Sequence, residues 1–214
     1  MSFEQDIKNC TDRYAAVCAD ILQSLAAEDA AKGPDQHPFP FAQARAWALV
    51  WLAAGVEVFW RSYLEALCKA LAISGKHKLR RHLRAQLVFF YDRLLTIGAG
   101  EALSTWKKGG DLLQSLVTDA RAPIVFRIPF DGRTVRPEHV ETVWELFDLP
   151  TPPFPSPIHR TDLDTLANKR NEIAHGHLSP VTVGRLVTKA DVLATVTRVS
   201  EIVDRCVLVS GSFK

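Results

Sequence analysis

The stretch AWALVWLAAGVEVFW (46–60) is the most apolar part of the 214-residue chain, and it indicates which kind of fold to expect. It lies within a longer helical pattern, from about 42 to 73, whose apolar side chains cover much of the circumference: Trp47, Val50, Trp51, Ala54, Val58, Tyr63 and Leu67. A helix that is apolar on most sides is buried by other helices, which predicts the central helix of an all-α bundle. Glu57 interrupts the stretch and Arg45 and Arg61 flank it, so it is too short and too polar to span a bilayer.

Helical patterns also cover most of the chain on either side of this stretch. Further helices are expected over about 3–31, 79–97 and 101–119, as a short helix in RPEHVETVWELFDLP (136–150), and over 161–176 and 188–209. In RAPIVFRIPFDGRTV (121–135), alternating apolar residues and an Asp-Gly pair permit a short hairpin or a loop. PTPPFPSP (150–157) predicts an extended connector, because proline does not fit a helix interior. The pattern predicts an all-α bundle with long early helices, a proline-rich connector and two late helices.

The two late helices carry the same start signal. TDLD (161–164) and TKAD (188–191) each place a threonine three residues before an aspartate, which is the spacing of a capping box. Thr161 and Thr188 are therefore predicted to be N-caps. Gly176 is predicted to lie near the end of the first of these helices.

Length, composition and charge are those of a globular protein. The length predicts one domain over 1–214, in which helix 1–31 is either part of the bundle or an appended element and 121–160 is an insertion of loop and short helix. Apolar residues make up 47% of the chain and charged residues 23%, a balance that excludes a disordered chain. The net charge of +2 gives no indication of a nucleic-acid partner, so any such indication must come from local clusters.

The cysteines and the first residues bear on the compartment. The four cysteines contain no CxxC pair, which excludes zinc-ligand spacing and a disulfide framework and predicts small core residues in a reducing cytosol. The first residues, MSFEQDIKNC, lack a basic segment followed by an apolar one. A soluble cytoplasmic protein is expected.

The stretch LANKRNEIAHGH (166–177) places polar groups where a buried helix face is expected. At about 100° per residue, Arg170 falls in the middle of a face whose other members are apolar: Leu166, Ala167, Ile173 and Ala174. A second, adjacent stripe is polar: Asp164, Asn168, Asn171 and His175. On the same count Arg170 and His175 diverge by about 140°, so their side chains need not touch within one chain.

Residue spacing alone leaves the roles of Arg170 and His175 open. Arg170 pairs with a core carboxylate such as Glu57 or Glu65, covers a rim with its methylene stem, or faces a subunit interface where an anion binds. His175 is either structural, interacting with the carbonyl groups at the helix end, or catalytic, as an acid or base.

The segment RNEIAHG (170–176) resembles the motif of the HEPN superfamily, an arginine followed directly by a polar residue and then, four to six residues beyond the arginine, by a histidine. Arg170, Asn171 and His175 match it, and a glycine follows as in the RNEIAHG variant of bacterial HEPN proteins. The surroundings match as well, since the motif lies near the end of a late helix with one more helix after it. HVETVWELFDLP (139–150) ahead of a proline linker is similar to RiboL-PSP-type HEPN proteins, and the resemblance covers about residues 40–210.

The resemblance implies an HEPN-like bundle and metal-independent RNA cleavage by a homodimer in which the motifs of two subunits face each other. Arg170 then holds the scissile phosphate, His175 moves a proton, and Asn171 orients His175 or binds a phosphate oxygen. RNA supplies its own nucleophile, the 2′-OH, so no metal or other cofactor is expected. The family further implies a toxin–antitoxin or phage-defence setting with an antitoxin protein as partner.

Two other interpretations compete with the endoribonuclease. One is a non-catalytic HEPN module that binds RNA, a nucleotide or a protein partner. The other is a helical adaptor in which the motif is fortuitous and Arg170 is paired inside a monomer.

The segment GKHKLRRHLRAQ (75–86) holds the densest positive charge in the chain: Lys76, Lys78, Arg80, Arg81 and Arg84. It is either a phosphate-binding surface for RNA or a solvated helix start whose arginine stems cover apolar surface. The neighbouring aromatic residues could stack on bases, but core packing is expected of them: Phe89, Phe90 and Tyr91. In DGRTVR (131–136), Arg133 and Arg136 could make a second RNA contact, but they are expected to be ordinary surface residues of a mobile loop.

Overall fold

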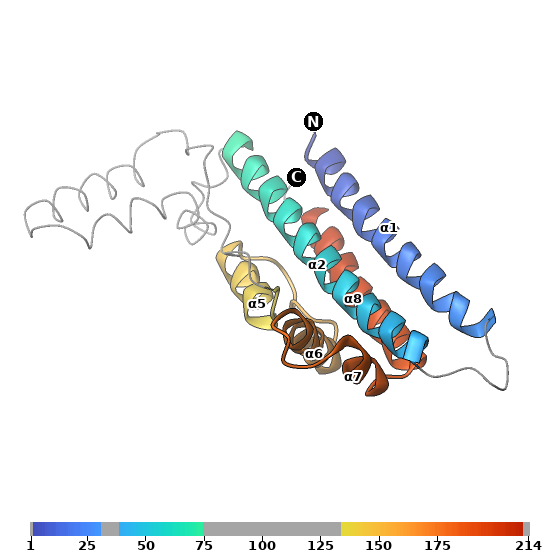
Figure 1. The fold of residues 1–214 in the computed structure, drawn as a ribbon. Helices are drawn as coiled ribbons and strands as arrows, with labels where there is room; N and C mark the ends of the chain where they lie inside the picture. The colour runs from blue at the N-terminus through green and yellow to red at the C-terminus, as the bar shows by residue number, and fades with distance from the viewer. Residues whose placement is uncertain (1, 31–38, 75–133, 212–214) are drawn as a thin grey trace, which may run out of the picture.

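The computed structural model describes residues 2–30, 39–74 and 134–211, and within these ranges the chain forms six helices and no strands (Figure 1). The helices are α1 (Phe3–Ala30), α2 (Phe39–Ser74), α5 (Pro137–Leu146), α6 (Pro157–Ala174), α7 (Pro180–Arg185) and α8 (Lys189–Ser210). The predicted all-α class is confirmed. The helices expected over 79–97 and 101–119, and all but the last two residues of 121–135, lie outside the described residues.

The central position predicted for α2 is observed. Its neighbours are α1 on one side and α6, α7 and α8 on others. The rings of Phe59, Trp60 and Tyr63 are buried and pack on one another with centroids 5.6 to 6.2 Å apart. The outer face of the helix stays exposed at Trp47 and Trp51, so α2 is covered on several sides but not on all. None of the described helices is long and apolar enough to cross a membrane.

A fork of hydrogen bonds from Arg45 joins three parts of the bundle. Arg45 donates from Nε and Nη2 to the carboxylate of Glu28 at 3.1 and 2.5 Å, and from Nη1 to the carbonyl of Val187 at 3.0 Å. Glu28 is buried, and a buried carboxylate is stable only when it is paired in this way. The end of α1, the start of α2 and the residues before α8 are thereby held together.

The cysteines behave as the sequence predicts within the described residues. All four are free, and Cys10, Cys68 and Cys206 are buried while Cys18 is half-buried. Loss of solvent around the Cys68 thiol raises its pKa to about 12, so this side chain stays protonated and packs as a small apolar group.

The two late helices begin differently, although both carry the same threonine–aspartate pattern. Thr188 is the N-cap of α8, where its Oγ1 accepts from the Asp191 N–H at 3.1 Å and the Asp191 carboxylate accepts from the Thr188 N–H at 2.8 Å. These bonds confirm the predicted capping box and hold the pKa of the Asp191 carboxyl below its ordinary value. The corresponding prediction for Thr161 is wrong, because α6 begins a full turn earlier and Thr161 lies inside it. There the Thr161 hydroxyl donates to the Pro157 carbonyl at 3.3 Å.

Serine–proline pairs mark two helix starts that were not among the predicted ones. Ser156 is the N-cap of α6 and Pro157 its first residue, a position that suits proline because no helical partner exists there for an N–H. Ser179 and Pro180 start the short helix α7 in the same way, and the Ser179 Oγ accepts from the Thr182 N–H at 3.1 Å. The non-helical connector before Ser156 and the start of α5 at Pro137 agree with the sequence.

Candidate functional site

The RNEIAHG segment lies where α6 ends and the chain turns. The last helical residue is Ala174, and the backbone N–H of His175 donates to the Asn171 carbonyl at 2.9 Å. Gly176 follows with a φ of 70°, a left-handed conformation that glycine adopts without strain. Arg170 and Asn171 therefore belong to the last turns of the helix, and His175 stands at its end.

The buried face of α6 does not extend along the whole helix. Leu166 and Ala167 are buried in the core, as predicted, whereas Ile173 is half-buried and Ala174 is exposed. The prediction of a buried position for Ala174 is wrong because neighbouring helices no longer cover this face in the last turn. Arg170 is half-buried and lies between the part of α6 that neighbouring helices bury and its exposed last turn.

The side chains of Arg170 and Asn171 are bonded to each other and to Thr134. Arg170 Nη1 donates to the Oδ1 of Asn171 at 3.2 Å, and the hydroxyl of the buried Thr134 donates to the same oxygen at 2.8 Å. Because both donors use the amide oxygen, the Nδ2 group of Asn171 keeps its two N–H donors, which have no partner among the described residues.

Pairing with a core carboxylate, one of the three explanations for Arg170, is not observed in the described part of the chain. Glu57 lies 3.9 Å from Arg61 on α2, and neither Glu57 nor Glu65 forms an ion pair with Arg170 there. A half-buried guanidinium whose neutral partner engages one nitrogen keeps most of its donors for an anion. The other two explanations, a rim position and a subunit interface, stay open.

Residues 134–136 lie along the polar stripe that the helical periodicity of α6 predicts. Arg136 donates from Nη1 to Asp164 at 2.8 Å and from Nη2 to Asn168 at 2.9 Å, while Thr134 reaches Asn171. Arg136 keeps part of its side chain exposed, but the Asp164 carboxylate compensates its charge, which leaves it less available to an RNA phosphate. Arg133 lies outside the described residues.

The ring of His175 is exposed at the helix end. Its centroid lies 5.9 Å from that of His177, which is also exposed. No hydrogen bond among the described residues joins the His175 ring to Arg170, Asn171 or a carbonyl group, and Asn171 is bonded to Thr134 instead. Within one chain, the three motif residues do not form a single connected site.

The predicted basic surface cannot be located, because its residues are not among those that the structure describes. The residues expected to bind the RNA backbone lie outside the described ranges: Lys76, Lys78, Arg80, Arg81 and Arg84. Within 2–30, 39–74 and 134–211, no three His, Cys, Asp or Glu side chains lie together where they could hold a metal ion.

Thr134 is a member of the site that the sequence does not single out. It lies 37 residues before Asn171, in a segment whose pattern permits a hairpin or a loop. No motif and no helical spacing link the two residues, so only the folded structure brings them together. No family model, curated protein or solved structure matches the chain.

Proposed function

We propose that the chain is a metal-independent endoribonuclease of the HEPN type that acts on cytoplasmic RNA as a toxin or phage-defence effector. One observation carries the proposal: the end of α6 presents groups that the rest of the described chain leaves free. These are most of the Arg170 guanidinium, the Nδ2 of Asn171 and the ring of His175. All belong to the segment that resembles the HEPN motif.

A phosphodiester is the substrate group that suits Arg170 and Asn171. A guanidinium binds phosphate oxygens through paired N–H donors, and an amide N–H group binds them through one or two more. The bond from the Thr134 hydroxyl fixes the orientation of the Asn171 amide, so that its oxygen faces the protein donors and its N–H groups remain for the substrate. Negative charge that develops on the phosphate during cleavage is stabilised by the same donors.

His175 is the group that can move protons in this site. Its ring is exposed at the end of α6, and an imidazole can take the proton of the ribose 2′-OH or give one to the leaving 5′-oxygen. Attack of the 2′-oxygen on phosphorus breaks the bond to the 5′-oxygen and leaves a 2′,3′-cyclic phosphate and a 5′-hydroxyl. RNA supplies the nucleophile, so DNA, which lacks this hydroxyl, is not a substrate.

A second subunit would complete the proposed site. Within one chain, no hydrogen bond joins His175 to Arg170 in the described residues, and cleavage needs both an acid and a base. Two copies with their α6 ends facing each other provide two imidazoles and two guanidinium groups around one phosphate. An enzyme of this kind damages the cell that makes it, which implies a neutralising antitoxin protein as a further partner.

Cleavage of total RNA in the presence of a chelator tests the proposal. Wild-type protein should cut RNA to products with cyclic-phosphate and 5′-hydroxyl ends, and His175→Ala should reduce the rate by about 10²- to 10⁴-fold, the usual contribution of general acid–base catalysis. His177→Ala is the matched control, because it removes the exposed neighbouring ring and should leave the rate unchanged. Absence of cleavage by the wild type, or equal loss in both variants, contradicts the proposal.

A non-catalytic binding module is the second candidate, and one observation favours it. Arg170 and Asn171 are bonded to each other and form an anion site without His175. Such a site can hold RNA or a nucleotide without turnover. Tight RNA binding by the wild type without product formation, lost in Arg170→Ala and kept in His175→Ala, supports this candidate over the nuclease.

A further inference from the structure

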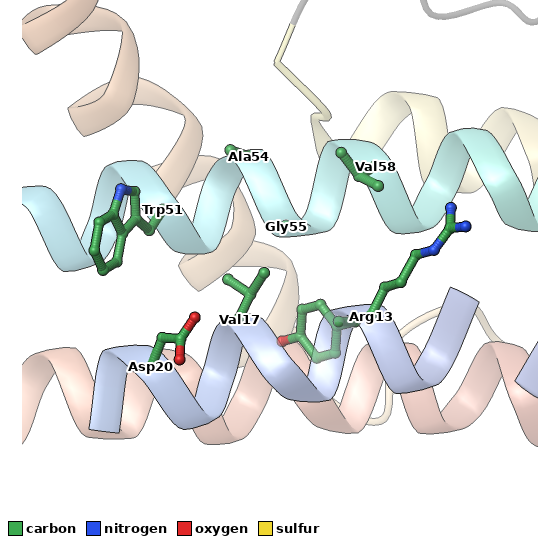
Figure 2. A pocket seen from close by; sticks show the side chains of 8 residues that line it. Arg13, Val17, Asp20, Trp51, Ala54, Gly55 and Val58 are labelled. Atoms are coloured by element: carbon green, nitrogen blue, oxygen red, sulfur yellow. The ribbon is translucent and has the colours of Figure 1, made fainter. Parts of the chain in front are cut away.

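A groove of about 320 Å³ lies between α1 and α2, on a side of α2 that the other described helices leave open (Figure 2). Val17, Ala54 and Gly55 are among its apolar lining residues. Gly55 allows the two helices to approach closely, since a Cβ at this position would lie 3.0 Å from a methyl group of Val17. The groove is thus part of the packing of α1 on α2.

The outer face of α2 forms an apolar stripe beside this groove. Trp47, Trp51, Ala54 and Val58 follow one another at helical spacing on the same side of the helix. The two tryptophans are 43% and 50% exposed and Val58 is 51% exposed. Single exposed apolar residues are normal on a protein surface, but a continuous stripe next to a groove is typical of an interaction site.

Charges of opposite sign stand at the two ends of the groove. Figure 2 shows Asp20 near Trp51 at one end and Arg13 extending toward Val58 at the other. Arg13 and Asp20 are two turns apart on α1, a distance of about 10 Å along the helix axis. Neither has an ion-pair partner among the described residues, so both charges are available to a bound protein.

We infer that a second copy of this chain covers the groove through a two-fold contact. An isologous interface requires a surface that complements itself after rotation by half a turn. About an axis through the middle of the groove, this rotation places Asp20 of each copy against Arg13 of the other. It also places each Trp51 over Val58 and the Arg13 side chain of the partner, where an indole and a guanidinium attract each other. The chain itself supplies every complementary group that this contact needs.

This contact is separate from the proposed nuclease site. In Figure 1, α1 lies on one side of α2 while α5 and α6 lie on the other, so a two-fold contact through the groove leaves the ends of α6 uncovered. Association through the groove and association through α6 therefore use different surfaces of the chain. The inference does not rest on the proposed function.

Charge reversal combined with light scattering tests the contact. Wild-type protein should have a solution mass well above the 23.8 kDa of one chain. Arg13→Glu and Asp20→Arg should each weaken the association by at least about tenfold, as close charge pairs at interfaces do. The double variant Arg13→Glu/Asp20→Arg should restore it, because each reversed charge again meets its opposite in the partner. Trp51→Glu should dissociate the contact without changing RNA cleavage.

The controls separate this contact from a general effect of charge or folding. Glu145→Arg reverses an exposed carboxylate on α5 and should leave the mass unchanged. Circular dichroism should report the same helix content for all variants, because each substitution is at an exposed position. A monomeric wild type, an unchanged mass in Trp51→Glu, or a double variant as weak as the single ones would overturn the inference.

Discussion

The first and second halves of α6 use their polar side chains differently. In the first half, residues of other elements bind them: His159 is bonded to Glu201 of α8, and Asp162 to Arg198 of α8 at 2.5 Å. In the second half, Asn168 and Asn171 accept from Arg136 and Thr134, but most donors of Arg170 and the Nδ2 group of Asn171 have no partner among the described residues. The ring of His175, directly after the helix, has no hydrogen-bond partner among them either.

This difference indicates which polar residues hold the fold and which are available for a ligand. A buried polar group that keeps its hydrogen bonds contributes to stability, and losing the partner destabilises the protein. A polar group that the protein leaves unpaired near its surface adds little to stability. The first half of α6 therefore anchors the helix, and the second half presents donors and an imidazole to solvent or to a substrate.

The largest expected effect is a loss of RNA cleavage on substitution of Arg170, in the second half of α6. Arg170→Ala should lower the rate of RNA cleavage by about 10²- to 10³-fold, because it removes a donor that stabilises charge on the phosphate. The free energy of unfolding should fall by no more than about 1.5 kcal/mol, since a single hydrogen bond from a half-buried guanidinium to a neutral amide is lost. Lys169→Ala removes the adjacent half-buried cation and is the control. Similar losses of cleavage in both variants would assign the effect to net charge.

The first half should respond in the opposite way. His159 is buried, its Nδ1 lies 2.9 Å from the Ser156 Oγ, and its Nε2 is bonded to Glu201. His159→Ala should lower the free energy of unfolding by about 2 kcal/mol, measured by urea titration, because two hydrogen bonds and packing are lost. Cleavage by the folded protein at low temperature should stay at the wild-type rate. Glu201→Gln, whose side chain can still bond the ring, should lose less stability. A loss equal to that of His159→Ala would contradict this stabilising role of the His159 ring.

Thr134 is bonded to Asn171 in the second half of α6, so its hydroxyl should affect activity more than stability. Thr134→Val keeps the shape of the side chain but removes the donor to Asn171, and kcat should fall about tenfold, equivalent to one hydrogen bond. Thr134→Ser keeps the hydroxyl and should retain the wild-type kcat, while KM should change little in both variants. A valine variant as active as wild type, or a serine variant as slow as valine, would show that Thr134 contributes packing alone.

The starts of the late helices show how far local sequence patterns determine structure. TDLD and TKAD have the same form, yet only Thr188 is a cap. Before Thr161 stand Ser156 and Pro157, which allow the helix to begin earlier, whereas the residues before Thr188 lie in a turn after α7. A capping pattern predicts a start only when no acceptable start precedes it. The serine–proline pairs were present in the sequence and could have indicated both α6 and α7.

The features of the candidate site that depend only on the periodicity of α6 could be predicted from the sequence. Helical periodicity predicted the polar stripe and the separation of Arg170 from His175. It could not predict the bonds from Arg136 and Thr134, whose partners lie 28 to 37 residues further along the chain. Nor could it predict the exposure of Ala174, which depends on how far neighbouring helices reach.

The smallest expected effect compares two carboxylates within the first half of α6. The side chain of Asp162 is 15% exposed in its pair with Arg198, and that of Asp164 is 40% exposed in its pair with Arg136. Asp164→Ala should lower the free energy of unfolding by about 0.5 kcal/mol, since an exposed ion pair is screened by water. Asp162→Ala should lower it by about 1 kcal/mol, because its partner loses a less exposed bond.

Salt dependence sharpens this comparison. At about 1 M salt the Debye length falls to about 3 Å, so the effect of Asp164→Ala should shrink towards zero while most of the effect of Asp162→Ala remains. Urea titrations of both variants at low and high salt measure the difference. Equal salt sensitivity in the two variants would mean that the less exposed pair is no better shielded from solvent than the exposed one. The first half of α6 would then be held to the bundle by His159 and its apolar face rather than by its ion pairs.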